Sequence, residues 1–86
     1  MPSPFAFDPV LSGKASSTIV GLSKSKQRIV MDLIYGLADY PGQRGDYSTR
    51  DDQGHDIQHI RLGDWHFSYW ADSAVREFRI TEITEL

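Results

Sequence analysis

The sequence of 86 residues contains no cysteine, so neither a disulfide nor a thiolate metal site is available to it. It also lacks an apolar run long enough to span a membrane. Met1 to Val10 has neither the basic nor the apolar region of a secretory signal. The length of 86 residues predicts one domain over residues 1–86. The absences predict that it is located in the cytoplasm and is not associated with a membrane.

An excess of positive charge is missing as well. Twelve acidic residues outnumber nine Lys and Arg, which gives a net charge of −3. Affinity for phosphates comes largely from Lys and Arg, so the overall charge argues against nonspecific binding of nucleic acid. Cations are nevertheless concentrated in the N-terminal third, which leaves a local basic surface open; they are Lys14, Lys24, Lys26 and Arg28.

The clearest helix is predicted over Ser23 to Tyr40, where apolar residues recur at helical spacing. Ser23 or Ser25 is expected to cap its start, and Pro41-Gly42 to end it. Three cations lie in its first turns, where the helix dipole disfavours positive charge. They are either solvated side chains or substrate-binding groups: Lys24, Lys26 and Arg28.

Shorter elements are predicted on either side of this helix. Phe5 to Phe7 is expected to form a strand that ends at Asp8-Pro9, because a residue before proline favours extended geometry. Val10 to Leu22 is expected to contain a short helix. Tyr47 to Thr49 is expected to be a short edge strand.

The stretch from Asp56 to Ile80 alternates apolar and polar residues, which predicts a three-stranded antiparallel meander. Gly63-Asp64 forms a good two-residue turn, because glycine adopts a positive φ without steric cost. Counting outward from this turn gives a register for the first hairpin. The expected pairs are Leu62 with Trp65, Arg61 with His66, Ile60 with Phe67, His59 with Ser68 and Ile57 with Trp70.

The second turn is expected at Asp72-Ser73, or as a four-residue loop over Ala71 to Ala74. Both choices give the same register. The expected pairs are Phe67 with Phe78, Trp65 with Ile80, His66 with Arg79, Ser68 with Glu77 and Trp70 with Val75. Ile83 falls out of phase with Ile80, so the last strand is expected to fray or bulge there.

This register separates an apolar face from a polar one. Helices on the apolar face give an α+β fold, in which one or two helices pack on one face of a three- to four-stranded antiparallel sheet after a short N-terminal strand. The expected core residues on the sheet are Ile60, Leu62, Trp65, Phe67, Tyr69, Phe78 and Ile80. The opposite face is expected to remain uncovered.

The polar face offers groups for cleaving RNA without a metal, which needs an acid, a base and cations for phosphate. The candidates for these catalytic roles are His59, Arg61, His66, Glu77 and Arg79. Trp70 is expected to stack on a base. The alternative is an ordinary solvated sheet face. No metal or cofactor is expected, because histidines four residues apart on a strand lie about 13 Å apart.

The phrases SKSKQRIVMDLIYGLADYP and IRLGDWHFSYWAD, followed by the strand RITEI, resemble the RelE/ParE toxin superfamily over about Phe5 to Ile83. The resemblance implies a small toxin neutralised by a cognate antitoxin. RelE-like members cleave mRNA, mostly on the ribosome, and ParE-like members poison DNA gyrase. Arg61 matches the arginine before the hairpin glycine, which in RelE-like nucleases contributes to phosphate or transition-state binding. His66 stands where the family often has a second arginine.

Two other classes of function remain open. One alternative to RNA cleavage is a ParE-like toxin that binds gyrase. The other is a catalytically silent relative that acts only through protein contacts, with an exposed strand edge as the binding element. A homodimer is a further option.

Overall fold

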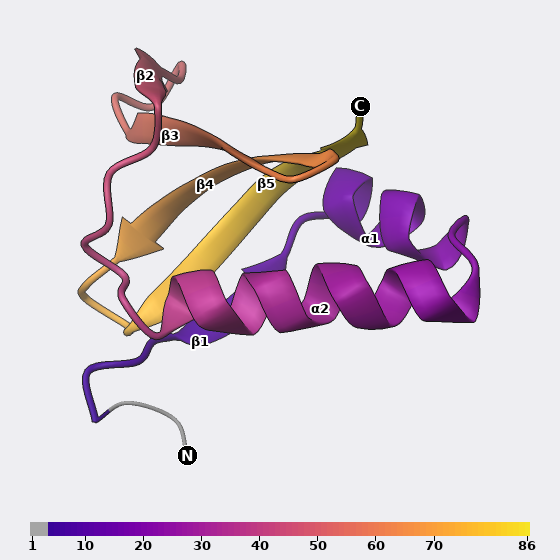
Figure 1. The fold of residues 1–86 in the computed structure, drawn as a ribbon. Helices are drawn as coiled ribbons and strands as arrows, with labels where there is room; N and C mark the ends of the chain where they lie inside the picture. Colours follow the sequence, from indigo (N-terminus) through magenta and orange to yellow (C-terminus); the bar gives the residue numbers. More distant parts are fainter. Residues whose placement is uncertain (1–3) are drawn as a thin grey trace.

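The computed structural model describes residues 4–86 and contains a single five-stranded sheet with two helices. The strands lie in the order β1-β5-β4-β3-β2, with β1 parallel to β5 and every other pair antiparallel (Figure 1). The bounds of the strands are β1 Asp8–Leu11, β2 Tyr47–Arg50, β3 Asp56–Leu62, β4 Trp65–Asp72 and β5 Glu77–Glu85. The predicted α+β class is confirmed, with a mixed sheet that has more strands than expected.

Both helices begin at a serine. Helix α1 spans Gly13–Val20, and the Ser12 side chain accepts a hydrogen bond from the Ala15 N–H. Helix α2 spans Lys24–Ala38, and Ser23 caps it in the same way through the Lys26 N–H. Because a serine at this position satisfies one of the free N–H groups of the first turn, the helix starts could be read from the sequence.

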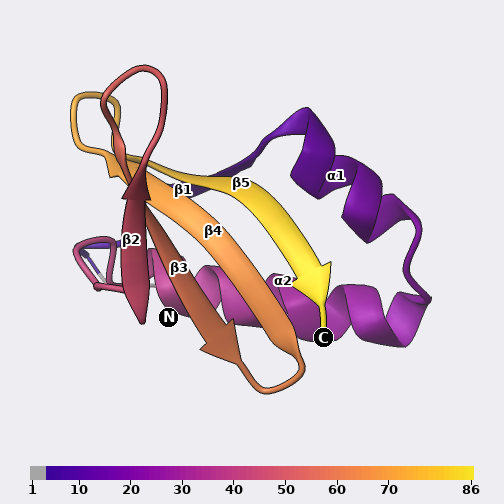
Figure 2. The same cartoon turned by 90° about the horizontal axis from the view of Figure 1, so that it is seen from above.

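The two helices cover one face of the sheet and leave the other bare (Figures 1 and 2). The core lies between them. The helices supply Ala15, Val30, Ile34, Leu37 and Ala38, and the sheet supplies Ile60, Trp65, Phe67, Tyr69, Phe78, Ile80 and Ile83. The predicted core face is therefore confirmed, except that Leu62 is only partly buried and Ile83 joins it.

The first hairpin has the predicted register. Leu62 pairs with Trp65, Arg61 with His66, and His59 with Ser68. Gly63 has a φ of 61°, the conformation for which glycine was expected. A shift of one residue would turn the aromatic side chains of β4 toward water, so burial of Trp65 and Phe67 fixes this register.

The predicted register of the second hairpin is wrong. Strand β4 continues to Asp72, which pairs with Glu77, and the turn lies at residues 73–76. Arg76 has a φ of 54° in this turn. Consequently Trp70 pairs with Arg79 rather than with Val75, and Ser68 pairs with Glu82 rather than with Glu77. The signal in the sequence was weak because this turn contains no glycine to mark the position with positive φ.

A β-bulge in this pair resolves the phase of Ile83. Tyr69 pairs with Ile80 and Ser68 with Glu82, so Thr81 is the extra residue on β5. One extra residue reverses the alternation of the strand beyond it. As a result Ile83 is buried in the core and Glu82 lies on the bare face. The bulge that the sequence left as an option is confirmed.

The N-terminal strand was predicted too early in the chain. It lies at Asp8–Leu11 rather than at Phe5 to Phe7, and it includes Pro9. The backbone N–H groups of Asp8 and Ser12 bond to β5, at the carbonyls of Arg76 and Ile80. Pro9 lies between these donors on an edge strand, where its missing N–H costs no bond with β5. No helix among residues 4–86 is long and apolar enough to cross a membrane.

Gly45 provides a test of how closely the chain before β2 approaches the backbone of β3. An ideal Cβ at Gly45 would clash with the carbonyl group of His59, so Gly45→Ala must push β3 or the preceding loop outward. We expect a loss of about 1–3 kcal/mol in the free energy of unfolding, measured by urea denaturation. Gly42→Ala is the matched control, because nothing lies within 4 Å of a Cβ there. Equal urea midpoints for the two variants would contradict the close contact.

Candidate functional site

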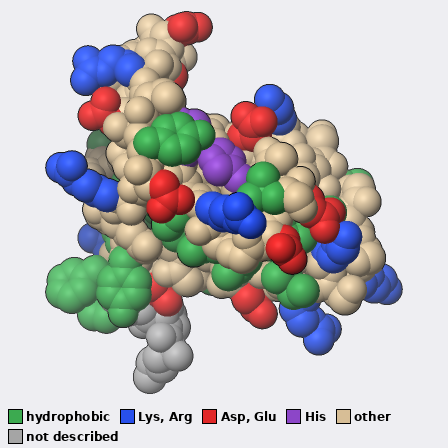
Figure 3. Space-filling view, turned by 45° about the horizontal axis from the view of Figure 1, so that its top comes forward, with side chains coloured by type: hydrophobic (Ala, Val, Ile, Leu, Met, Phe, Trp, Pro, Cys, Tyr) green, Lys and Arg blue, Asp and Glu red, His purple; other side chains and the backbone are tan. Residues whose placement is uncertain are grey.

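The bare face of the sheet carries a cluster that we call the histidine centre: Tyr47 of β2, His59 and Arg61 of β3, and His66 and Ser68 of β4. Histidine side chains are visible in the middle of this face in Figure 3. Acidic and basic side chains alternate around them, so this face is not a continuous basic patch.

His59 is held from three directions. Its Nδ1 lies 3.0 Å from the Ser68 hydroxyl and its Nε2 lies 2.8 Å from the Thr49 hydroxyl. The Tyr47 ring stacks on the imidazole, with centroids 4.5 Å apart and 5° between the planes. A neutral imidazole donates from one nitrogen and accepts at the other. Both bonds can therefore form with neutral His59.

The surroundings of His59 favour this neutral form. Burial lowers the pKa of His59 below 6.5, and the neighbouring His66 lowers it further, while the Glu82 carboxylate acts in the opposite direction. His59 is thus mostly unprotonated at pH 7, the state needed to accept a proton. The carboxylate of Glu82 would stabilise the imidazolium that such a transfer creates.

His66 lies beside His59, with ring centroids 5.5 Å apart. Its Nε2 is buried and has no hydrogen-bond partner among residues 4–86. Buried polar atoms in proteins are nearly always paired. This nitrogen is consequently a free hydrogen-bonding group within the histidine centre.

Arg61 pairs with His66 across the first hairpin. Its Nε donates to the Gly63 carbonyl at 3.0 Å, which anchors the side chain at the turn. Its backbone N–H donates to the Asp46 carboxylate at 2.9 Å. Within residues 4–86 no carboxylate forms an ion pair with its exposed guanidinium. The charge of Arg61 is therefore available to an anion such as a phosphate.

Glu77 and Arg79 are placed differently from the prediction, because of the corrected register. They bond to each other, with 2.6 Å between Arg79 Nη2 and Glu77 Oε1. Asp72 lies 3.6 Å from Arg79 Nε on the other side. Neither residue pairs with His66 or Ser68. The predicted group of five therefore divides into the histidine centre and a separate ion-pair cluster.

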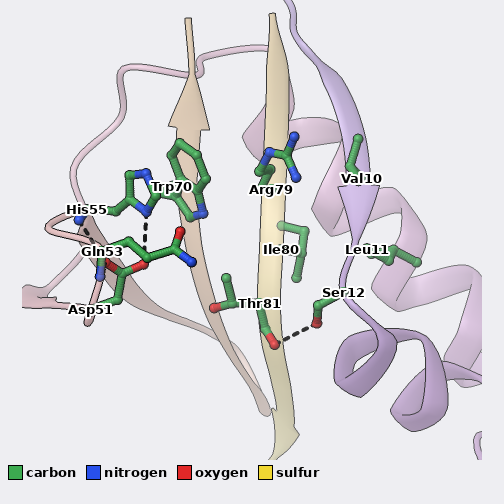
Figure 4. A pocket seen from close by; sticks show the side chains of 10 residues that line it. All are labelled: Val10, Leu11, Ser12, Asp51, Gln53, His55, Trp70, Arg79, Ile80 and Thr81. Carbon is green, nitrogen blue, oxygen red and sulfur yellow. Dashed lines mark hydrogen bonds and ion pairs between the residues drawn. The ribbon is translucent and has the colours of Figure 1, made fainter. Parts of the chain in front are cut away.

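Trp70 is occupied on both sides. The His55 ring stacks on it with centroids 3.9 Å apart, and the Arg79 guanidinium lies 5.5 Å from its ring centroid. Figure 4 shows these two side chains flanking the indole from opposite sides. Base stacking by Trp70, as predicted from the sequence, would require His55 or Arg79 to move.

The cations of α2 lie in the helical layer, on the other side of the sheet from the histidine centre. Lys26 bonds to Glu85 at 2.7 Å, while Lys24 and Arg28 are exposed. The predicted substrate-binding cations are thus not brought together with the histidines. Lys14 of α1 does approach this face, because it forms a 3.4 Å ion pair with Glu82.

Three members of the site were missed by reasoning from the sequence: Tyr47, Thr49 and Glu82. The edge strand that carries Tyr47 and Thr49 was predicted, but not its pairing with β3. The signal for Glu82 was the phase of Ile83: a bulge that brings Ile83 into the core also turns Glu82 to the polar face. Within residues 4–86, no three His, Asp or Glu side chains are grouped to hold a metal ion.

No protein-family model and no curated protein matches this sequence. Solved structures do match its fold. A chain of the toxin–antitoxin complex RelBE2 from Mycobacterium tuberculosis superimposes with a TM-score of 0.76 at 15% identity, over 94% of this chain and 99% of that one. The chain has a RelE/ParE-like fold.

Two further structures agree with this assignment. The archaeal RelE–RelB complex from Pyrococcus horikoshii matches with a TM-score of 0.65 at 17% identity, over 93% of this chain and 94% of that chain. The isolated RelE toxin of E. coli matches with a TM-score of 0.68 at 11% identity, over 93% and 84%. The resemblance noted in the sequence is therefore confirmed at the level of the RelE/ParE-like fold.

The surroundings of His59 predict the direction in which its pKa is shifted. We expect its pKa, followed by NMR of the ring protons, to lie below 6.5. Glu82→Gln should lower this pKa further, because it removes the carboxylate that raises it. Glu85→Gln is the matched control, since Glu85 bonds to Lys26 in the helical layer.

The same shift has a consequence for stability. Unfolded His59 binds protons more readily than folded His59, so its contribution to stability is complete above pH 6.5 and is lost as the pH falls toward the folded pKa. A measured His59 pKa at or above 6.5 would contradict the burial of His59 beside His66. An equal change of this pKa in Glu82→Gln and Glu85→Gln would contradict the position of Glu82 near His59.

Proposed function

We propose that this protein is the toxin subunit of a toxin–antitoxin pair and that a cognate antitoxin neutralises it. The proposal is supported by the RelE/ParE-like fold, because the matching structures are described as an isolated RelE toxin and as complexes of toxin with antitoxin.

As the activity, we propose cleavage of RNA without a metal ion at the histidine centre. The observation that supports it most is the arrangement on the bare face: a neutral His59, a second histidine 5.5 Å away between ring centroids, and the unpaired cation of Arg61. Polar side chains on an ordinary solvated sheet face bond to water or to one another, whereas the buried Nε2 of His66 has no partner within residues 4–86.

In this mechanism the 2′-oxygen attacks the adjacent phosphorus and the bond from phosphorus to the 5′-oxygen breaks. His59 accepts the proton of the 2′-hydroxyl, which takes the place of the Thr49 hydroxyl at Nε2. His66 donates a proton to the leaving 5′-oxygen. Arg61 bonds to the phosphate oxygens, where negative charge develops.

Glu82, rather than Glu77, stabilises the protonated His59 in this proposal. Glu82 pairs with Ser68, and the Ser68 hydroxyl bonds to His59 Nδ1. Glu77 keeps its ion pair with Arg79. Arg79 is therefore assigned a supporting position beside Trp70 and not direct phosphate binding.

The alternative is a toxin that acts through protein contacts alone, as a gyrase binder or without any catalytic step. It is favoured by strand β2, a fully exposed edge strand to which a partner segment can add. The mixed charges on the bare face are compatible with a protein partner as well.

The function is tested by inducible expression in a bacterial host, alone and together with the neighbouring open reading frame. We expect growth arrest that the neighbour relieves, and pulse labelling that shows loss of protein synthesis before DNA synthesis. The double variant Arg61→Ala/His66→Ala should grow normally while its far-ultraviolet circular dichroism matches the wild type.

The control is Lys24→Ala/Arg28→Ala, which removes exposed cations from the helical layer. We expect it to arrest growth as the wild type does. Arrest by the folded Arg61/His66 variant would contradict cleavage at the histidine centre. Early loss of DNA synthesis would favour the gyrase alternative instead, and the absence of any arrest would contradict the toxin assignment.

A further inference from the structure

A pocket of about 260 Å³ lies beside the histidine centre, between the loop that joins β2 to β3 and the strands β4, β5 and β1 (Figure 4). We call it the Trp70 pocket. Its polar side chains include Gln53, Trp70 and Arg79, and Leu11 and Val10 contribute apolar surface. The volume lies just below that of pockets for drug-sized ligands, so it suits one small ring system.

The walls of this pocket are ordered by specific bonds. The Asp51 carboxylate accepts hydrogen bonds from the backbone N–H groups of Gln53 and His55 and lies 2.9 Å from His55 Nδ1. Burial alone would raise the pKa of Asp51, but these bonds outweigh it and lower the pKa. The loop is therefore fixed by Asp51, and the Gln53 side chain is not needed to hold it.

The cation in the pocket is largely neutralised. Arg79 contacts two carboxylates, those of Glu77 at 2.6 Å and Asp72 at 3.6 Å. An anionic ligand would meet these carboxylates as well as the guanidinium and would gain little from the site. The charge balance thus favours a neutral ligand.

Hydrogen-bonding groups with no partner face this space. In Figure 4 the indole nitrogen of Trp70 and the side-chain amide of Gln53 point into the pocket. Neither forms a hydrogen bond within residues 4–86. The indole N–H is a donor, and the amide supplies both donors and an acceptor. The complement is a planar neutral ring whose edge carries both acceptors and donors.

We propose that the Trp70 pocket binds the nucleobase next to the cleaved phosphate, by its edge rather than by stacking on Trp70. The proposal rests on the proposed cleavage of RNA for the identity of the ligand. Trp70 lies two residues from Ser68 on the same face of β4, a separation of about 7 Å. One extended sugar–phosphate unit spans that distance from the histidine centre.

The test is an NMR titration of the intact protein with each of the four nucleoside 5′-monophosphates. The chain has two tryptophans, and Trp65 is buried on the opposite face of the sheet. We expect the indole N–H signal of Trp70 to shift saturably for at least one nucleotide while that of Trp65 stays in place. Ribose 5-phosphate, which lacks a base, should cause no such shift.

Gln53→Ala should weaken this binding about tenfold, the loss expected from one or two hydrogen bonds. Asp52→Ala is the matched control, because its side chain is exposed and lies outside the pocket. It should bind as the wild type does. In a cleavage assay Gln53→Ala should lose preference among bases next to the cut.

Several outcomes would overturn the proposal: no saturable shift with any nucleotide at about 10 mM, equal binding of ribose 5-phosphate, or equal affinities for Gln53→Ala and Asp52→Ala. These outcomes concern binding and do not depend on cleavage. If nucleotides bind in the pocket and no RNA is cut, the proposed function fails while the base site stands. If RNA is cut and no nucleotide binds there, the reverse holds.

Discussion

The pairing of β4 with β5 is the constraint on which both faces of the sheet depend. Thr81 is inserted between Ile80 and Glu82 without a partner on β4. Its hydroxyl donates to the Ser68 carbonyl at 3.2 Å, and its own carbonyl accepts from the Ser12 hydroxyl at 2.8 Å. Since Ser12 also caps α1, this one irregularity joins the central strands to the first helix. A regular strand would place Ile83 in water and Glu82 in the core.

The parts of the fold that could be predicted are those in which a local signal agrees with burial. The turn at Gly63 and the aromatic side chains of β4 give the same register for the first hairpin, and Ser23 and Pro41-Gly42 mark the helix between them. The second hairpin lacked such agreement. Arg76 adopts a positive φ that usually falls to glycine, and no sequence rule identifies an arginine there. Its guanidinium lies over the Phe7 ring, 5.2 Å from the ring centroid. Arg76 and Phe7 are far apart in the sequence, so the pattern of residues around the turn does not predict this contact.

The same distinction explains the candidate site. His59, Arg61 and His66 belong to the correctly predicted hairpin and were found together. Glu77 and Arg79 were assigned to the same group only because of the wrong second register. The turn lies two residues later in the chain than predicted, which moved them to Trp70, and the bulge at Thr81 then brought Glu82 opposite Ser68. A register error on a sheet exchanges whole sets of neighbours, because side chains alternate with a period of two.

The bare face thus contains two environments with different electrostatic properties. At the histidine centre, Arg61 has no ion-pair partner and the pKa of His59 is lowered. The site therefore offers a positive charge to an anion and a neutral imidazole that can accept a proton. At the Trp70 pocket, two carboxylates surround Arg79 and the free groups are neutral donors and acceptors. A nucleotide has a charged phosphate and a neutral base with a patterned edge. Under the two proposals, each half of this ligand would meet the environment that matches it, with the phosphate at Arg61 and the base toward Trp70.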